Sequence, residues 1–251
     1  MPKFERRSPR ALAFRSLLIL AGALMLMAAL APTAKADLIA YFNFEDAANG
    51  AAPDFTSEFD QGLGIATTIT TDYNPANMSN VAATFTNNRW PTDADTTLHG
   101  WGMSRTSPNN GSHFDIPLFS SQGFFQNMSL SFAISSSGNG FTQAIFQYST
   151  NGGASFTTFF TSPAIPPNAI TLLSAAVPAA ANNAPSLVLR VILTGGTSNG
   201  NNSESIIDNI RVEGTIVPEP TTIAGGLLGV LGLCFHQRRR LRFLLLLSRR
   251  I

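Results

Sequence analysis

Cysteine is almost absent from this 251-residue chain, since Cys234 is the single one. A disulfide framework therefore does not hold the chain together, and no Cys/His spacing typical of a structural zinc site occurs. Lysine is missing from residues 37–216, which carry four basic and thirteen acidic residues, a net charge of −9. Because binding to a phosphate backbone depends on clustered basic side chains, this balance argues against nucleic acid as a partner.

Motifs of catalytic chemistry are lacking as well. The chain has no Gly-x-Ser-x-Gly, no His-Glu-x-x-His and no phosphate-cradling loop. Residues 37–216 contain two histidines, His99 and His113. The acidic residues of 37–216 are spread through segments expected to be loops. Two of them could form the carboxylate pair of a glycosidase, so that function stays an alternative. We expect a protein that is not an enzyme.

A helical period of apolar residues is also missing from 37–216, and residues that favour helices are scarce. Residues 128–134 instead alternate apolar and small side chains, the pattern of a half-buried strand. Thr150-Asn151-Gly152-Gly153-Ala154 carries the Asn-Gly signal of a β-hairpin. Strands are expected at 38–44, 81–86, 113–119, 128–134, 144–149, 155–161, 187–193 and 205–213, with one more near 170–177.

These strands predict an all-β fold, a single jelly-roll-like β-sandwich over residues 37–216. The segments 45–80 and 87–112 are expected to be long loops, which on a sandwich are usual carriers of function. In the last strand, the alternation places one set of side chains on a common face: Ile206, Asp208, Ile210 and Val212.

The N-terminus has the layout of a secretory signal peptide. Basic residues precede an apolar core from Leu17 to Leu30, and Ala34-Lys35-Ala36 follows. Ala34 and Ala36 are the small residues that a signal peptidase reads, so we expect cleavage after Ala36 and export of the rest of the chain. The alternative, a first transmembrane helix, fits less well because the apolar run is short.

The C-terminal part combines a proline motif, an apolar run and a basic cluster. Pro218 and Pro220 keep the backbone around Glu219 extended, and a helix can begin with Thr221 or its neighbour as N-cap. The uncharged run from Ile223 to Phe235 predicts a transmembrane helix in membrane lipid. Three consecutive arginines then form a stop on the cytoplasmic side: Arg238, Arg239 and Arg240. An ordinary membrane anchor is the simplest interpretation.

This ordered set resembles the PEP-CTERM sorting signal of bacterial exported proteins. The resemblance covers residues 217–240, with Pro218-Glu219-Pro220 and the following Thr221 as its motif. It implies processing by an exosortase, a membrane protease-transpeptidase, near the tripeptide. It also implies an inner-membrane-anchored precursor that is later placed at the cell surface or in an extracellular matrix. The tail at 241–251, apolar and basic, departs from the usual pattern, which ends just after the basic cluster.

The hairpin at 149–156 resembles the Asp-box of sialidase-like propellers, with Asn151 where that pattern has Asp. Because only one copy occurs, we interpret it as a turn and not as a sign of a glycosidase. Together with the strand at 205–212 it resembles the second half of extracellular jelly-roll modules of carbohydrate-binding type. In several of those families a structural calcium sits where the first and last strands meet, which implies Glu45 and Asp208 as ligands. The alternative is that both are turn and edge residues.

Aromatic residues in the expected long loops are candidates for ligand binding. Trp90 and Trp101 offer broad apolar faces suited to stacking on a sugar ring, and Tyr73 lies in the other loop. Polar residues nearby are Arg89, His99 and Arg105. The alternative is that these rings cap the end of the core. Four Asn-x-Ser sequons, at Asn77, Asn110, Asn127 and Asn201, are as expected by chance in a chain rich in both residues.

Taken together, the sequence predicts an exported, exosortase-sorted envelope or matrix protein that binds or scaffolds glycans, associated with exopolysaccharide. A secreted polysaccharide-active enzyme, either a glycoside hydrolase or a lyase, is the first alternative. A simple membrane-anchored adhesin is the second.

Overall fold

The computed structural model describes residues 37–45, 48–57, 67–83, 85–89, 91, 98–119, 124–217 and 232. Within them the chain forms strands β1 (Asp37–Phe42), β2 (Thr70–Thr71), β3 (Met78–Ala82), β4 (His99–Met103), β5 (His113–Phe119), β6 (Phe124–Ser136), β7 (Gln143–Ser149), β8 (Thr157–Thr161), β9 (Ile170–Ala176), β10 (Ser186–Thr194) and β11 (Ser205–Val217). Two short 3-10 helices accompany them, η1 (Pro75–Asn77) and η2 (Ala179–Ala181).

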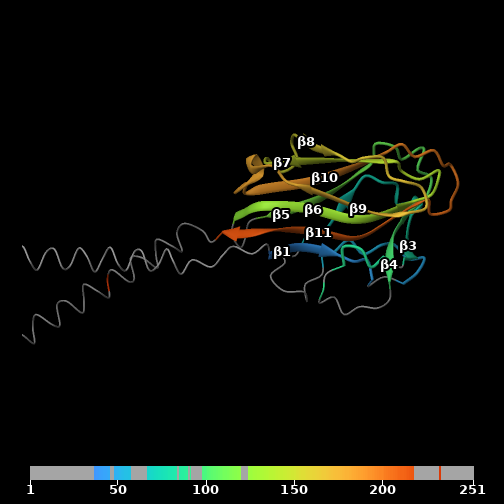
Figure 1. The fold of residues 1–251 in the computed structure, drawn as a ribbon, viewed down its shortest axis with the longest axis horizontal. Helices are drawn as coiled ribbons and strands as arrows, with labels where there is room; N and C mark the ends of the chain where they lie inside the picture. Colours follow the sequence, from blue (N-terminus) through green and yellow to red (C-terminus); the bar gives the residue numbers. More distant parts are fainter. Residues whose placement is uncertain are drawn as a thin grey trace, which may run out of the picture. The chain divides into compact units, whose positions relative to one another are not determined.

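The strands form two antiparallel sheets. The six-stranded sheet has the order β3-β4-β11-β6-β9, with β1 also paired to β11, and the five-stranded sheet has the order β2-β5-β10-β7-β8. Figure 1 shows the two layers, with β7, β8 and β10 in the upper one and β11 and β1 in the lower one. The prediction of an all-β sandwich is confirmed. Most neighbours in each sheet are far apart in sequence, so the fold is built from long-range pairings.

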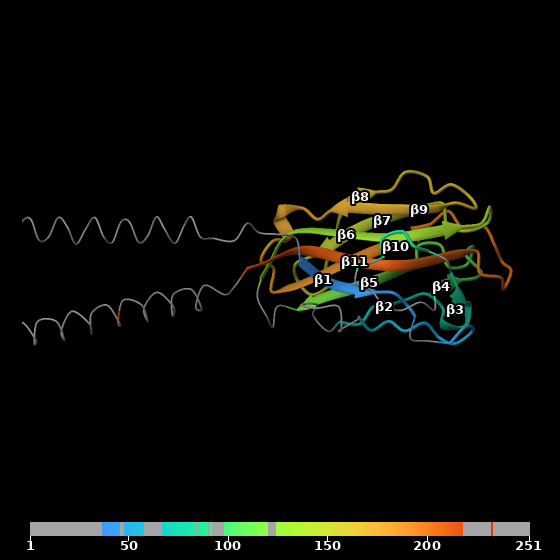
Figure 2. The same ribbon diagram turned by 60° about the horizontal axis from the view of Figure 1, so that its bottom comes forward.

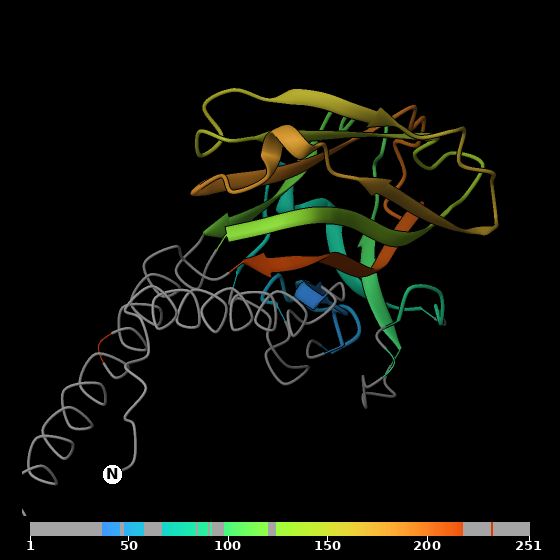
Figure 3. The same ribbon diagram turned by 60° about the vertical axis from the view of Figure 1, so that its left-hand side comes forward.

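Strand β11 is the centre of the six-stranded sheet. Along one edge it pairs first with β4 through Ser205–Ile207 and then with β1 through 210–214. Along its other edge it pairs with β6. Figure 2 shows β1 and β4 one after the other beside β11, and Figure 3 shows β11 (orange-red) between β6 (yellow-green) and β1 (blue).

The facing sides of the two sheets meet in an aromatic core. Phe132 of β6 stacks on Phe146 of β7, with ring centroids 5.6 Å apart and planes at 16°. Phe114 of β5 meets Phe132 edge-on at 5.9 Å, and Trp101 of β4 meets Phe114 at 5.6 Å. All four side chains are buried. Since each such ring removes roughly 150–250 Å² from water, this core supplies the apolar burial that replaces disulfides.

The sequence patterns missed two strands. β2 and β4 lie inside the segments that we expected to be long loops. β4 reads His-Gly-Trp-Gly-Met, and its glycines remove the alternation that signals a strand. They are needed for close packing, because a Cβ at Gly102 would lie 2.8 Å from the Val81 side chain and one at Gly100 would lie 2.9 Å from Ile206.

A β-bulge interrupts β11. Ala133 of β6 pairs with Asp208 and Ser131 pairs with Arg211, so two residues of β11 lie opposite one of β6. Asn209, the first of the two, takes φ 53°. Asparagine tolerates this left-handed region better than most residues, and a bulge is a place that uses it.

The bulge reverses the alternation of side chains along β11. Ile207, Ile210 and Val212 all belong to the core between the sheets, whereas Ile206 packs with Ala83 and Phe85 on the other face. The expectation that Ile206, Asp208, Ile210 and Val212 share one face was therefore wrong. A one-residue insertion moves every following side chain to the opposite face, and no local sequence pattern announced it.

The Asn209 side chain makes several hydrogen bonds. It accepts a hydrogen bond from the Tyr41 hydroxyl (2.5 Å) and donates to the Phe85 carbonyl (3.0 Å) and to Asp208 Oδ2 (3.0 Å). Its backbone carbonyl accepts from Asn88 Nδ2 at 2.7 Å. We call these five residues the bulge cluster. It fastens the segment 85–89 onto the outer face of the six-stranded sheet.

The hairpin between β7 and β8 is confirmed. Gly152 and Gly153 have φ values of 70° and 92°. Asn151 Oδ1 accepts from the Ser155 amide (3.1 Å) and from Ser149 Oγ (2.7 Å). The Asn151 side chain therefore closes the turn, which agrees with interpreting the Asp-box resemblance as a turn.

Several predicted features lie outside the described residues. These are the signal peptide 1–36 with Ala34 and Ala36, the sorting motif Pro218–Thr221, the stop Arg238–Arg240, the tail 241–251 and Trp90. The predicted membrane helix also lies outside, apart from Gly232. Among the described residues, no helix has the length and apolar character needed to cross a bilayer.

Candidate functional site

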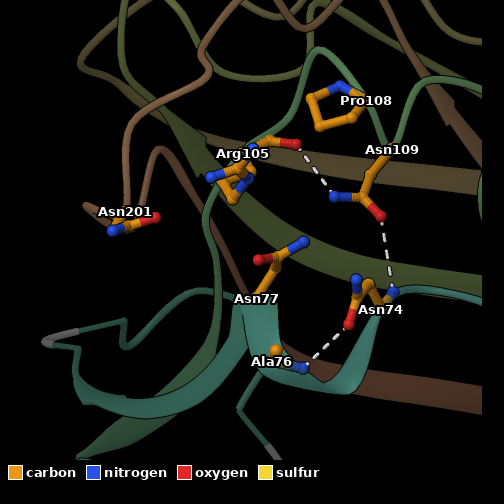
Figure 4. A pocket seen from close by; sticks show the side chains of 7 residues that line it. All are labelled: Asn74, Ala76, Asn77, Arg105, Pro108, Asn109 and Asn201. Atoms are coloured by element: carbon orange, nitrogen blue, oxygen red, sulfur yellow. Dashed lines mark hydrogen bonds between the residues drawn. The ribbon is translucent and has the colours of Figure 1, made fainter.

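A polar pocket opens at the end of the sandwich where three loop segments meet. It has a volume of about 640 Å³ and is lined by Asn74, Ala76, Asn77, Arg105, Pro108, Asn109 and Asn201. Figure 4 shows these residues on three separate stretches of chain around one space. The first stretch leads into β3, the second follows β4, and the third joins β10 to β11.

The first wall is fixed by a helix cap. Asn74 is the N-cap of η1, and its Oδ1 accepts a hydrogen bond from the Ala76 amide at 3.0 Å. Pro75 at the first helical position supplies the φ that a helix start requires. The tetrapeptide Asn-Pro-Ala-Asn thus specifies its own turn locally. This turn holds Asn77 at the rim, and the Asn77 carbonyl accepts from the Ser104 amide at 2.9 Å.

The second wall contains an unusual backbone conformation. Arg105 has φ 50°, in the left-handed region that residues other than glycine and asparagine seldom adopt. Its amide donates to the Gly200 carbonyl (3.0 Å), and its carbonyl accepts from Asn109 Nδ2 (2.8 Å). Asn109 Oδ1 in turn accepts from the Asn74 amide (3.4 Å). These contacts hold Arg105 in place from both sides.

The third wall is joined to the second by a two-way hydrogen bond. Asn110 Oδ1 accepts from the Gly196 amide (2.8 Å) and Asn110 Nδ2 donates to the Gly196 carbonyl (2.6 Å). The Ser107 amide donates to the Ser198 carbonyl at 2.8 Å. Gly196 must be glycine here, because a Cβ would collide with the side chain of Thr106. The walls are therefore fixed to one another before any ligand arrives.

The base of the pocket region rests on the core. Tyr73 is buried, and its hydroxyl donates to the Ser104 carbonyl at 2.5 Å. Burial raises the pKa of Tyr73 well above its usual range, so the phenol stays protonated and keeps donating. Tyr73 also meets Trp101 and Phe141 edge-on, at 6.4 and 6.1 Å. The loops are thereby attached to the rigid sandwich.

Three side chains around the pocket are not used by the fold. Asn77, Arg105 and Asn201 make no side-chain hydrogen bond or ion pair with any residue that the structure describes. In Figure 4 they face the common space, while Asn74 and Asn109 are held by their hydrogen bonds. An amide offers a donor and an acceptor, and a guanidinium offers five donors. The rim can therefore bind a ligand rich in hydroxyl or carboxylate groups.

Trp101, one of the two tryptophans predicted to bind a ligand, lies in the core, and the other, Trp90, lies outside the described residues. Trp101 lies in β4, and only 1% of its side chain is exposed. Its ring packs against Phe55 at 4.9 Å as well as against Phe114. Trp101 and Tyr73 thus belong to the core, so neither ring has a face open for stacking on a sugar. The period-2 signal that would have placed Trp101 in a strand is hidden by the glycines on either side.

The two carboxylates proposed for calcium both lie beyond the same end of the β1–β11 ladder. The β1–β11 ladder ends with the pair Phe42 and Ile210, so Glu45 and Asp208 both come just beyond its end. Both are buried, 6% and 1% exposed. Calcium takes six to eight oxygens, and no group of three His, Cys, Asp or Glu side chains that could hold a metal occurs among the described residues. Asp208 also accepts hydrogen bonds from the amide and side chain of Asn209. The calcium site stays a prediction.

Sequence reasoning named Arg105 but missed the asparagines around it. Asn77 and Asn201 each open an Asn-x-Ser sequon, but such sequons occur by chance in this Asn- and Ser-rich chain and did not mark the pocket. The Asn-Pro start of η1 was a local signal of the turn that positions Asn77. What no pattern could supply is that residues 74, 105 and 201 meet at one end of the sandwich.

Comparisons with known proteins give a fold-level likeness. No protein-family model matches the chain, and no curated protein matches it by sequence. Among solved structures, TmCBM61 in complex with β-1,4-galactotriose is 10% identical, with a TM-score of 0.34 over 61% of this chain and 88% of that one. The xylan-binding domain CBM22-2 of Xyn10C from Paenibacillus barcinonensis is 10% identical, with a TM-score of 0.37 over 70% and 98%.

An adhesin domain is similar to the same degree. The K2 cleaved adhesin domain of Lys-gingipain is 11% identical, with a TM-score of 0.41 over 70% of this chain and 97% of that one. This chain therefore resembles β-sandwich modules, several of which are described as carbohydrate-binding.

Proposed function

We propose that this protein is a non-enzymatic glycan-binding module, exported and attached to the cell envelope or its matrix. One observation carries the binding proposal. Three polar side chains, Asn77, Arg105 and Asn201, surround a pocket of about 640 Å³ and are not used by the fold. In the bulge cluster, by contrast, polar side chains satisfy one another.

The chemistry of the rim suits saccharides. A sugar presents hydroxyls that both donate and accept hydrogen bonds, and carboxamides match both roles. The volume suits a small ligand or the end of a chain, since such pockets are typically about 300–1,000 Å³. The walls are already fixed by the Asn74 cap and the Asn110–Gly196 contact, so binding has little loop ordering to offset.

An enzymatic role receives no support from this pocket. Glycoside hydrolysis uses two carboxyl groups that flank the scissile bond. None of the seven residues that line the pocket in the described part of the chain is acidic. Such a rim can bind and orient a saccharide, but it contains neither an acid nor a base for cleavage.

The export and sorting part of the proposal rests on the sequence. The signal peptide 1–36 and the Pro218-Glu219-Pro220 motif with its apolar run and arginines support an exported, exosortase-processed precursor. Signal peptidase, exosortase and membrane lipid are its partners on the way to the surface. Exopolysaccharide is the partner that a surface glycan-binding module would meet there.

Binding can be tested on the full-length protein in detergent micelles with a glycan array. We expect Asn77→Ala and Asn201→Ala each to lower affinity about 5- to 10-fold, since each removes hydrogen bonds of about 1 kcal/mol. Asn202→Ala is the matched control, because Asn202 is exposed beside Asn201 and does not line the pocket. The proposal fails if no glycan binds, or if Asn202→Ala weakens binding as much as Asn201→Ala.

Sorting can be tested separately. Glu219→Ala leaves the apolar run intact, so membrane insertion should persist while processing decreases. A precursor with its C-terminal helix should then accumulate in the membrane fraction of a host with an exosortase, as seen by immunoblotting. Equal processing of Glu219→Ala and the parent would show that the segment is a plain anchor.

A further inference from the structure

The pocket carries a charge of the opposite sign to the domain around it. Residues 37–216 have a net charge of −9. Among the described residues that line the pocket, Arg105 is the one charged side chain, and the others are asparagine, alanine and proline. A guanidinium in a lining that contains no carboxylate makes the rim a place that attracts anions on an acidic protein.

The other arginines of 37–216 are engaged. Arg190 binds Asp115 through two parallel hydrogen bonds, of 2.7 and 2.8 Å, and lies 3.6 Å above the Phe156 ring. Arg211 contacts Glu213 at 2.5 Å. Arg89 also takes part in an interaction. The Arg105 side chain makes no hydrogen bond or ion pair with the described residues, and it lines the pocket.

The backbone of Arg105 is held in a conformation that glycine would adopt at lower free energy. Its φ of 50° is maintained by the hydrogen bonds to Gly200 and Asn109. Left-handed residues other than glycine and asparagine are concentrated at functional sites, where the surrounding structure imposes the strain. Here the arginine side chain makes no hydrogen bond or ion pair with the described residues in return. Its guanidinium is therefore available to a ligand in the pocket.

We propose that the pocket binds an acidic saccharide, with the carboxylate of a uronic acid on Arg105 and the sugar hydroxyls on Asn77 and Asn201. This inference rests on the proposed glycan binding and specifies its substrate class. The planar guanidinium fork matches a carboxylate with two hydrogen bonds. Because the rest of the domain repels polyanions, the preferred ligand is a single uronate flanked by neutral sugars and not a polyuronate.

The test uses matched pairs of oligosaccharides on an array, with the full-length protein in detergent micelles. Each acidic member carries one glucuronate or galacturonate on a neutral backbone. Its partner is the same oligosaccharide with the carboxyl group reduced to a primary alcohol. We expect the acidic member of at least one pair to bind about 10- to 100-fold more tightly, and the preference to decrease as NaCl is raised.

Two variants locate the effect. Arg105→Gln should remove the preference for the acidic member while neutral oligosaccharides still bind, and Arg105→Lys should retain part of it because the charge remains. Thermal melting of each variant shows that it is folded. Equal binding of both members of every pair would overturn the acidic class and leave glycan binding intact. Binding of no oligosaccharide at all would overturn both proposals.

Discussion

Asn209 and Arg105 adopt almost the same left-handed backbone, with φ values of 53° and 50°, in two regions of opposite character. Asn209 lies in the bulge of β11, and its amide group bonds with Tyr41, Phe85 and Asp208. Arg105 lies in a loop at the pocket, and its side chain bonds with none of the described residues. In the first region the unusual backbone lets a side chain hold the fold together. In the second, the fold holds the backbone so that the side chain is presented outward.

The comparison shows how strain can be interpreted physically. A residue in an unfavourable conformation that gains several buried hydrogen bonds is explained by architecture. A residue in the same conformation that gains none is a candidate for function. By this criterion, substitutions at Asn209 should change stability, and substitutions at Arg105 should change binding.

The largest effect is expected at the bulge cluster. Asn209→Ala removes buried hydrogen bonds to Tyr41, Phe85 and Asp208 and places alanine at positive φ. We expect a loss of about 3–4 kcal/mol in the free energy of unfolding. Urea unfolding measures it. A loss below about 1 kcal/mol would contradict an architectural role for the cluster.

A smaller loss in the free energy of unfolding is expected for a substitution where the second and third pocket walls join. Gly196→Ala places a methyl group against Thr106, which must shift together with the Asn110–Gly196 contact. We expect destabilisation of about 1–3 kcal/mol and weaker glycan binding, because the wall moves. Gly138→Ala is the matched control, since a Cβ there meets nothing within 4 Å. If the Gly196→Ala protein is destabilised but binds glycans as the parent does, the segment that contains Gly196 does not contribute to binding.

Arg105→Gly should act in the opposite direction from Asn209→Ala on stability. Glycine adopts positive φ without steric cost, so the free energy of unfolding should rise by about 1 kcal/mol while binding of acidic oligosaccharides is lost. Asn168→Gly is the control, because Asn168 has φ 57° and lies outside the pocket. It should leave binding unchanged. A destabilised Arg105→Gly protein would mean that Arg105 belongs with Asn209, as part of the architecture.

The smallest effect concerns calcium at Glu45 and Asp208, the second of which belongs to the bulge cluster. An ion on Glu45 and Asp208 predicts that EDTA lowers the melting temperature by a few degrees, and that added Ca²⁺ restores it by mass action. Mg²⁺ should not substitute, because it requires a smaller octahedral site. A melting curve unchanged by EDTA would show that no calcium ion stabilises the protein at Glu45 and Asp208.

Sequence predictions succeeded where a structure is determined by residues close together in the chain, and they failed where it depends on another strand. His113–Phe119 was predicted as a strand with both ends correct, and the hairpin at Asn151-Gly152 was found, because alternation and turn chemistry act over a few residues. β4 was missed because its glycines make room for the side chains of Val81 and Ile206, which belong to other strands. The face of Ile206 was wrong because a bulge changes the register without a local signature.

The candidate site also divides into features set by nearby residues and features set by strand pairing. Arg105 was named as a loop residue near the aromatic candidates, yet Trp101 proved to be core, since burial is decided by which strand lies opposite. Asn77 and Asn201 are more than 120 residues apart in sequence, and only the pairing of β3, β4 and β11 brings their loops to one end.

The sequence by itself determined the all-β class, the dependence on an apolar core without disulfides, the acidic charge and the local turns. Each of these follows from composition or from interactions within a few residues. The tertiary structure alone decided the strand order, the bulge, the burial of Trp101 and the convergence of Asn77, Arg105 and Asn201 on a pocket. These depend on pairings between segments far apart in the chain, whose free energies come from surfaces that meet only in the folded sandwich.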